Sequence, residues 1–308
     1  MTSAGTSKHA AIRIALIGFG EAGQAFVQGW QGESGTPSFA AFDVKTTDSE
    51  TAAAKKADYK RFRVAGQESL AEALSGAQAV FSVVTADRAH EAAAAAAKVI
   101  TPGTLFFDCN SCAPGTKRKS EALIEAAGGR YVDTAVMAPV HPGLHKTPLL
   151  LAGHHVDDAL ALVTGLGMKA KPVEGGTGAA SAIKMTRSVM IKGLEALVLE
   201  CVLAGRAANV DDAVLASLDA SFPGFDWKAK AAYMMERVMT HGIRRAAEMR
   251  EVALTVDDTG LSGDMARATV EWQQRVGDLK LNAEEIGHDY GALADALLSA
   301  LGAGARKA

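Results

Sequence analysis

Short apolar runs alternate with stretches of helical periodicity over the first half of the chain. The first run, Ile12–Ile17, is rich in β-branched residues and suits a strand buried on both faces of a sheet. Similar runs predict strands at Ser38–Phe42, Ala79–Val84, Leu105–Phe107 and Tyr131–Val136. The stretches between them predict helices at Gln24–Trp30, Ser69–Leu74, Asp87–Ile100 and Pro114–Ala126. Such alternation is typical of βαβ units with right-handed crossovers and a parallel sheet.

The pattern changes at the glycine-rich loop Glu174–Gly178. A long helix is expected over residues 179–204, and further helices follow to the C-terminus with a break at Ser221–Gly224. No convincing strand pattern occurs after the loop. The sequence therefore predicts an α/β protein in three parts. These are a disordered leader at 1–10, an α/β domain at 11–174 and an all-α domain at 175–308.

Composition and charge argue against several classes of protein. Of the 308 residues, 48% are hydrophobic and 22% are charged, as in an ordinary folded protein. A net charge of −3 and an aromatic content of 6% disfavour a nucleic-acid binder. No apolar run approaches the ~20 residues that a bilayer requires, and residues 1–10 lack the pattern of a secretory signal. Three cysteines fit a reducing compartment, so we expect a cytoplasmic protein that binds a small molecule, with no nucleic acid and no membrane.

A G-x-G-x-x-G motif follows the first predicted strand directly. It comprises Gly18, Phe19, Gly20, Glu21, Ala22 and Gly23. In a Rossmann domain the first glycine permits a tight turn, the second lets the backbone approach a pyrophosphate, and the third allows close helix–strand packing. Asp43 ends the second strand, where a carboxylate accepts hydrogen bonds from the adenosine ribose. These features predict bound NAD rather than a ligand-free glycine turn, and Lys45 keeps NADP possible.

Two cysteines, Cys109 and Cys112, form a C-x-x-C at a predicted strand-to-helix junction. A thiol redox site or a zinc site is one interpretation of this spacing. However, zinc needs about two further ligands, and no second pair is evident. We favour polar contacts to a ligand from Ser111, and from Thr85 after the preceding strand, because ligands of open α/β sheets bind at the carboxyl ends of the strands. No metal is expected.

A narrow polar stripe runs along the predicted helix at residues 179–204. At about 100° per residue, five polar side chains fall within roughly 80° of arc, and the remaining circumference is mostly apolar. They are Ser181, Lys184, Ser188, Lys192 and Glu195, and Arg187 borders them. The stripe is either a solvated strip or a surface that faces a cleft or a partner.

Several segments resemble the β-hydroxyacid dehydrogenase family of the 6-phosphogluconate-dehydrogenase-like superfamily. Gly18–Gly23 matches its cofactor motif, and Asp108–Pro114 matches its D-x-S-T-x-x-P segment. Asp133–Thr147 matches its substrate loop, and Gly176–Lys184 matches its catalytic lysine segment. Lys184–Ser188 and His241–Arg245 are similar to a branch with an uncharacterised C-terminal domain. The resemblance implies a Rossmann domain followed by an all-α domain.

The resemblance also implies roles for individual residues. Lys184 would be the general acid and base, with Ser111 and Ser188 orienting the reacting oxygen. The substrate would meet Arg187, Met137 and His241, and the cofactor would meet the motif residues, Asp43, Thr85, Ser111 and Arg244. Burial on an apolar helix and the neighbouring charge of Arg187 are expected to lower the pKa of Lys184 from about 10.4.

The chain departs from the family pattern at two places. Met137-Ala138-Pro139 replaces Ser-Gly-Gly in the substrate loop, and Pro139 has no backbone N–H to hold a carboxylate. Arg187-Ser188 replaces Asn-Asn after the lysine, and Arg187 can pair with a substrate carboxylate through two hydrogen bonds. The substrate is therefore expected to differ from the small acids familiar in the family.

Three functions are compatible with these residues. The first is an NAD(P)-dependent dehydrogenase that oxidises an alcohol, expected to be a hydroxy acid. The second is an imine reductase on the same fold, although Lys184 argues against it because that branch usually replaces the lysine. The third is a non-catalytic NAD(P)-binding protein. The apolar helices of the second domain also predict a homodimer.

Overall fold

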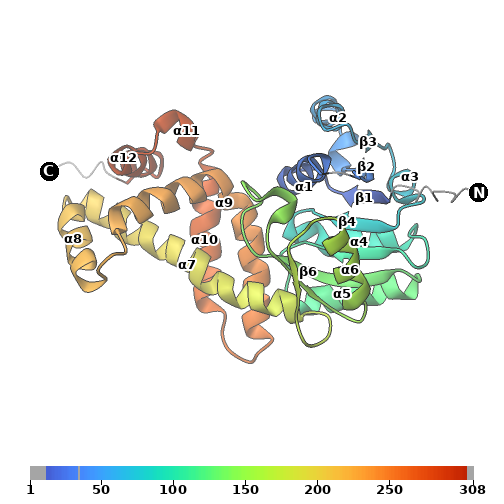
Figure 1. Ribbon diagram of the computed structural model, residues 1–308. Helices are drawn as coiled ribbons and strands as arrows, with labels where there is room; N and C mark the ends of the chain where they lie inside the picture. Colours follow the sequence, from blue (N-terminus) through green and yellow to red (C-terminus); the bar gives the residue numbers. More distant parts are fainter. Residues whose placement is uncertain (1–11, 34, 304–308) are drawn as a thin grey trace, which may run out of the picture. The chain divides into compact units, whose positions relative to one another are not determined.

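The computed structural model describes residues 12–33 and 35–303 (Figure 1). The chain divides into two compact units, and the boundary falls between Lys184 and Met185, inside one helix. The predicted leader at 1–10 lies outside the described residues.

The first unit is built on a sheet of eight strands in the described part of the chain, in the order β3-β2-β1-β4-β5-β6-β7-β8. The strands are β1 (Arg13–Ile17), β2 (Ser38–Phe42), β3 (Ala65–Gly66), β4 (Ala79–Ser82), β5 (Leu105–Asp108), β6 (Arg130–Val136), β7 (Leu149–Ala152) and β8 (Ala170–Pro172). Neighbours pair in parallel, except that β7 is antiparallel to β6. The carboxyl ends of β1, β2, β4 and β5 therefore meet at one edge of the sheet.

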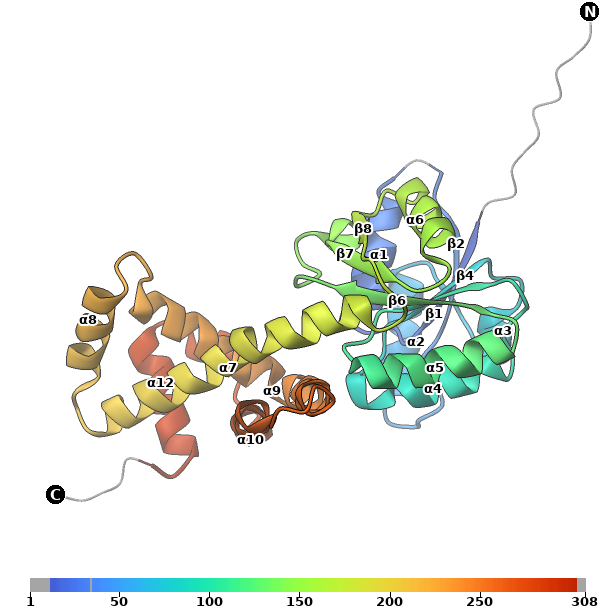
Figure 2. The ribbon, with the colours of Figure 1, turned by 90° about the horizontal axis from the view of Figure 1, so that it is seen from below.

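Helices cover both faces of this sheet, as Figure 2 shows. One face packs against α1 (Glu21–Gln31), α2 (Ala52–Arg61) and α6 (Val156–Gly165), and the other against α3 (Leu70–Leu74), α4 (Ala89–Ala97) and α5 (Pro114–Ala126). Three short 3₁₀ helices lie in loops: η1 (Val44–Thr46), η2 (Ala86–Arg88) and η3 (Leu144–Lys146). Alternate residues of β1 serve the two faces, with Ile14 and Leu16 in one core and Ala15 and Ile17 in the other.

The five predicted strands are present, but the sheet holds more than the sequence pattern indicated. Strands β3, β7 and β8 and helices α2 and α6 were not predicted. The expectation of a wholly parallel sheet is wrong at β7. The connection from β6 to β7 contains only the three-residue η3, so no crossover helix carries the chain to the opposite end of the sheet.

The second unit is helical throughout its described residues. Its helices are the long α7 (Ala179–Ala207), which begins in the first unit, and then α8 (Asp211–Ser221), α9 (Trp227–Asp257), α10 (Asp264–Asp278), α11 (Ala283–Ile286) and α12 (Tyr290–Ala300). Helices α9 and α10 approach closely, because a Cβ atom on Gly277 would lie 2.6 Å from the backbone nitrogen of Ile243. The predicted order, a Rossmann-type α/β domain followed by an all-α domain, is confirmed. No helix in the described ranges has the length and apolarity needed to cross a membrane.

Candidate functional site

The glycine motif forms the turn between β1 and α1. Gly18 has φ +84°, and a Cβ atom there would lie 2.9 Å from the carbonyl oxygen of Val83. Gly23 lets α1 pack on the strand, because its Cβ would lie 3.2 Å from Gly18 O. Gly20 is exposed, has no atom within 4 Å of a Cβ position and begins α1 without a side-chain cap. The N-terminal backbone of α1 is thus open to an anionic group such as a pyrophosphate.

Asp43 stands at the end of β2 and holds this turn in place. Its Oδ2 accepts a hydrogen bond from Phe19 N at 2.8 Å, and its Oδ1 accepts one from Lys45 N at 3.0 Å. The buried Lys55 of α2 donates to Phe19 O at 2.7 Å and lies 3.9 Å from Asp43 Oδ2. Lys55 was not predicted as a residue of this site, because α2 is too polar to show an amphipathic pattern.

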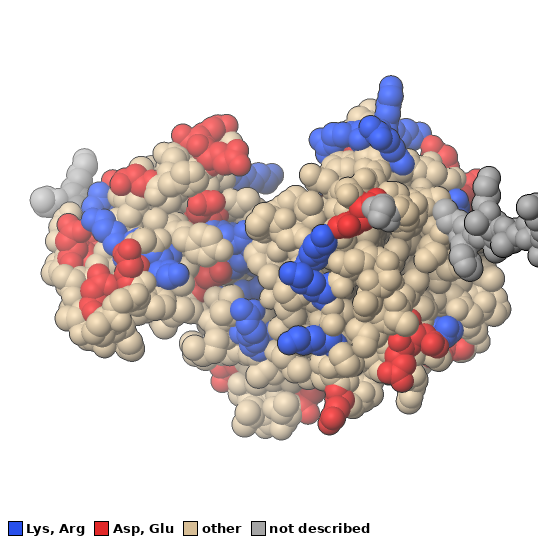
Figure 3. All heavy atoms as spheres, in the orientation of Figure 1, with Lys and Arg blue, Asp and Glu red and all other residues tan. Residues whose placement is uncertain are grey.

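Lysine and arginine side chains gather over α2, next to η1 and Asp43 (Figure 3). The helix contributes Lys55, Lys56, Lys60 and Arg61. Of these side chains, Lys55 lies near the carboxylate of Asp43, at the position where the adenosine ribose binds in Rossmann domains.

The ends of β4 and β5 present polar groups at the same edge of the sheet. Thr85 is exposed at the start of η2, and Ser111 is half-buried after β5. The buried amide nitrogen of Asn110 donates to Ser82 Oγ at 3.0 Å and to Asp108 Oδ1 at 2.7 Å. Among the described residues, Asn110 Oδ1 is a buried acceptor without a hydrogen-bond partner. Together with the open turn at Gly20, this acceptor fits a polar ligand such as a nicotinamide dinucleotide.

Cys109 and Cys112 are both buried and form no disulfide. Burial raises the pKa of Cys109 to about 12, against the opposing positive charges of Lys117 and Lys184. The thiol is therefore protonated at neutral pH and is a poor nucleophile. In the residues that the structure describes, no three His, Cys, Asp or Glu side chains are grouped as a metal site would require.

Two aspartates and a lysine form a fully buried ionic cluster beside these strand ends. Asp108 and Asp133 are register partners on β5 and β6. Lys117 of α5 lies 3.1 Å from Asp108 Oδ1 and 3.6 Å from Asp133 Oδ1, and it donates to the Asp108 carbonyl at 2.5 Å. Tyr131 donates to Asp108 Oδ2 at 2.6 Å. Burial lowers the pKa of Lys117, but attraction to the two carboxylates outweighs it and raises the pKa overall.

Asp133 also caps the first turn of α7. Its Oδ2 accepts from the backbone nitrogens of Gly178 and Ser181, both at 3.0 Å, and its Oδ1 accepts from Ser181 Oγ at 2.5 Å. Lys184, which is half-buried, follows Ser181 by one helical turn. Ser181 and Lys184 were predicted from the sequence, but the pair of Lys117 and Asp133 was not. Lys117 lies among the basic residues Arg118 and Lys119, so the local sequence gave no sign that it is buried.

The remaining predicted site residues belong to the helical unit, apart from Met137. Met137 is half-buried after β6, and its backbone nitrogen donates to Pro148 O at 2.9 Å. In the helical unit Arg187 is exposed and His241 is half-buried. Arg244 lies 2.8 Å from Glu248 Oε1.

The polar stripe of α7 is not a solvated strip. Ser181, Ser188, Lys192 and Glu195 are all buried. Lys192 lies 2.6 Å from Glu248 Oε2, and Glu195 pairs with Arg245. Burial lowers the pKa of Lys192, and Glu248 opposes this effect. The stripe therefore meets polar partners inside each unit.

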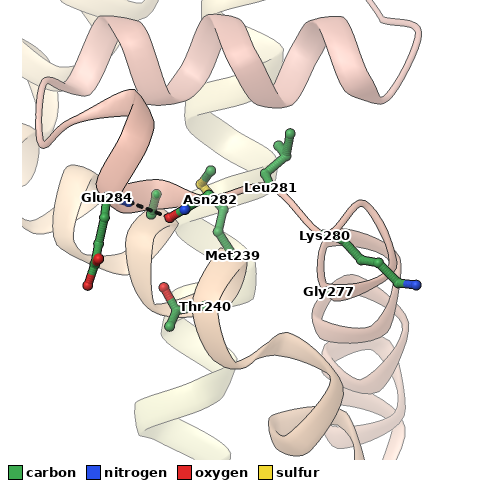
Figure 4. A pocket seen from close by; sticks show the side chains of 8 residues that line it. Met239, Thr240, Gly277, Lys280, Leu281, Asn282 and Glu284 are labelled. Carbon is green, nitrogen blue, oxygen red and sulfur yellow. Dashed lines mark hydrogen bonds between the residues drawn. The ribbon is translucent and has the colours of Figure 1, made fainter. Parts of the chain in front are cut away.

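A pocket of about 390 Å³ lies within the helical unit (Figure 4). It is lined by Met239, Thr240, Gly277, Lys280, Leu281, Asn282, Ala283 and Glu284. Asn282 Oδ1 accepts from Glu284 N at 3.1 Å and caps the short α11. None of the predicted site residues lines this pocket.

The sheet order, the glycine turn and the acid after β2 define a dinucleotide-binding Rossmann domain joined to a helical domain. Residues 13–157 match the family model for the NAD binding domain of 6-phosphogluconate dehydrogenase, and residues 206–276 match a domain of unknown function, DUF1932. The chain belongs to the β-hydroxyacid dehydrogenase family, in a branch with a divergent C-terminal domain. The resemblance seen in the sequence is confirmed, and the family and fold are those of NAD(P)-dependent oxidoreductases.

Solved structures agree with this assignment. A conserved hypothetical protein from Sinorhizobium meliloti 1021 is 34% identical, with a TM-score of 0.69, over 93% of this chain and 97% of that one. A 3-hydroxyisobutyrate dehydrogenase from Mycobacterium tuberculosis is 17% identical, with a TM-score of 0.67, over 94% of this chain and 99% of that one. An imine reductase from Myxococcus stipitatus in complex with NADP+ is 16% identical, with a TM-score of 0.51, over 92% and 99%. The last two show a shared fold. The search of curated proteins found no match.

Proposed function

We propose that the protein is an NAD(P)-dependent dehydrogenase that oxidises the CH–OH group of a hydroxy acid, with Lys184 as general acid and base. The observation that carries this proposal is the position of Lys184. It follows by one helical turn the residues that bond to Asp133, and Asp133 is the register partner of Asp108 at the end of β5. A titratable amine thus lies near strand ends that fit a nicotinamide cofactor.

A nicotinamide cofactor held at the glycine turn would supply the acceptor for the hydride of the carbinol carbon. The hydride leaves only as the hydroxyl proton departs, so a base must lie within ~2.6–3.2 Å of that oxygen. Lys184 takes this proton in oxidation and returns it in reduction. Ser111 and Ser188 orient the oxygen, and Arg187 pairs with the substrate carboxylate, with Met137 and His241 also at the substrate.

The cofactor is proposed to bind at Gly18–Gly23 with its ribose at Asp43, and to contact Thr85, Ser111 and Arg244. Asp43 supports NAD, because a carboxylate repels a 2′-phosphate. Lys45 and Lys55 keep NADP open as the alternative, since both are close to that carboxylate.

The protein is also proposed to be a homodimer. Met190 and Leu197 lie seven residues apart on α7 and are 69% and 58% exposed, so this helix carries apolar side chains that a second copy could cover. The cytoplasmic location remains a prediction from the cysteine content.

A substrate panel tests the reaction. The full-length protein is assayed with 3-hydroxyisobutyrate, other 2- and 3-hydroxy acids and aryl alcohols, with NAD or NADP, by the absorbance of the reduced cofactor. Lys184→Met should cut turnover by ~10²–10⁴-fold and leave cofactor affinity near wild type. Arg187→Met should mainly raise the KM for acids.

Matched controls separate this mechanism from the alternatives. Lys171→Met removes an exposed lysine of the first unit and should leave turnover unchanged. Near-normal turnover by Lys184→Met would refute the proposed role. Reduction of cyclic imines with NADPH, without alcohol oxidation, would favour an imine reductase. Tight NADH binding without turnover of any compound would favour a non-catalytic protein.

A further inference from the structure

We propose that Lys117 is a positioning residue that holds Lys184 in place through Asp133 and the first turn of α7. This inference rests on the proposed role of Lys184 as general acid and base. Lys117 does not reach the substrate site itself, because its side chain is completely buried. It acts by fixing the carboxylate on which the start of α7 depends.

Lys117 lies between two buried carboxylates that repel each other. Asp108 and Asp133 face each other across β5 and β6, and their side chains are 2% and 0% exposed. Two buried carboxylates so close together repel each other, and each also has to give up its hydration. The ammonium group of Lys117 contacts both carboxylates, offsets their mutual repulsion and fixes their orientation.

The orientation of Asp133 allows it to cap the first turn of α7. A helix leaves its first backbone N–H groups without partners inside the helix. Asp133 accepts from two of them and from the Ser181 hydroxyl, and a negative charge there also complements the helix dipole. Gly178, at the start of this turn, has φ +104°. Asp133 therefore fixes the first turn of α7.

The turn capped by Asp133 determines where the amine of Lys184 lies. Lys184 follows Ser181 by three residues, so any displacement of the capped turn moves the amine by a similar distance. Proton transfer requires hydrogen-bond distance, and a misplacement of about 1 Å can cost ~10²-fold in rate. Glu121 of α5 also accepts from Thr177 Oγ1 at 2.6 Å, so the same helix that carries Lys117 holds the start of α7 at a second point.

The test uses full-length Lys117→Met and Asp133→Asn, with Lys119→Met as the control. Lys119 is an exposed lysine on the same helix. Hydrogen exchange by mass spectrometry, with NADH present, reports on residues 178–184 and on β1. Kinetics with NAD and the hydroxy acid that wild type oxidises fastest in the substrate panel give kcat, and NADH titration gives the Kd of the cofactor.

We expect the effect of both substitutions on hydrogen exchange to be confined to the start of α7. In Lys117→Met and Asp133→Asn, exchange at residues 178–184 should rise at least tenfold while β1 stays protected. The value of kcat should fall about 10²-fold with the Kd of NADH unchanged. The control should match wild type. Asp133→Asn keeps the pair of Lys117 and Asp108, so it remains informative if Lys117→Met does not fold.

Two outcomes would overturn the inference. Uniformly faster exchange in β1 and α7 would mean that the cluster only stabilises the domain. Faster exchange at residues 178–184 with an unchanged kcat would mean that the position of this turn does not govern catalysis. If wild type oxidises no hydroxy acid of the panel but the exchange pattern is as expected, the cap assignment holds and the proposed function is what has failed.

Discussion

Asp43 is the residue on which the preference for NAD depends, and two substitutions separate its two tasks. Its carboxylate anchors the glycine turn through Phe19 N and is proposed to bind the adenosine ribose. Asp43→Asn keeps a side-chain oxygen that can accept from Phe19 N but removes the charge. Asp43→Ser shortens the side chain and removes both the hydrogen bond from Phe19 N and the proposed bond to the ribose. The difference between the two variants therefore measures the anchoring of the turn.

The expected loss of NADH affinity follows from the strength of the hydrogen bond between Asp43 and the ribose. A hydrogen bond to a charged group contributes roughly 1.5–3 kcal/mol, so losing the ribose contact should weaken NADH binding about 10- to 150-fold. Lys55 lies 3.9 Å from Asp43 Oδ2, and removing the negative charge exposes this cation to a 2′-phosphate. NADPH affinity should therefore fall less than NADH affinity, or rise. We expect the ratio of the two dissociation constants to shift at least tenfold toward NADPH.

Fluorescence titration of each variant with NADH and with NADPH, at fixed ionic strength, measures both constants. Asp48→Asn is the control, because Asp48 is an exposed carboxylate in the same segment whose Oδ1 accepts from Glu50 N and Thr51 N. It should leave the ratio unchanged. A wild-type protein that already prefers NADPH, or an Asp43→Asn variant with the wild-type ratio, would show that Asp43 does not select the cofactor.

Two further predictions concern buried side chains of the first unit. The double variant Cys109→Ser/Cys112→Ala should lose about 1–3 kcal/mol of stability in urea unfolding but keep its turnover, since both thiols are packed in the interior; activity that follows the redox state of the wild-type protein would contradict this. Burial lowers the pKa of His145, so the folded state binds a proton less readily than the unfolded state. The stability of wild type should therefore fall as the pH drops below about 6.5, and His145→Gln should lose less between pH 7.5 and pH 5; equal losses would rule out the histidine as the cause.

Much of the fold could be predicted from local patterns. Largely apolar runs such as Ile12–Ile17, interrupted only by Arg13, are readable because a strand buried on both faces needs apolar residues at nearly every position. The glycine motif is readable for a similar reason, since Gly18 occupies a backbone conformation and a space that other residues do not tolerate. Among the elements that were missed, β3 and β8 have two and three residues, too few for periodicity to appear, and α2 is too polar to show an amphipathic pattern.

The sequence by itself determined the order of the two domains, the cofactor turn and the helix that carries Lys184, because each follows from residues close together in the chain. Only the tertiary structure decided what the polar residues do. Lys117 is one of three consecutive basic residues in a helix, and its burial arises because Asp108 and Asp133, from two different strands, meet it at one point. The stripe on α7 had a visible pattern but no visible partner. Whether a buried charge is stable depends on its neighbours in space, and the spacing of residues along the chain does not specify them.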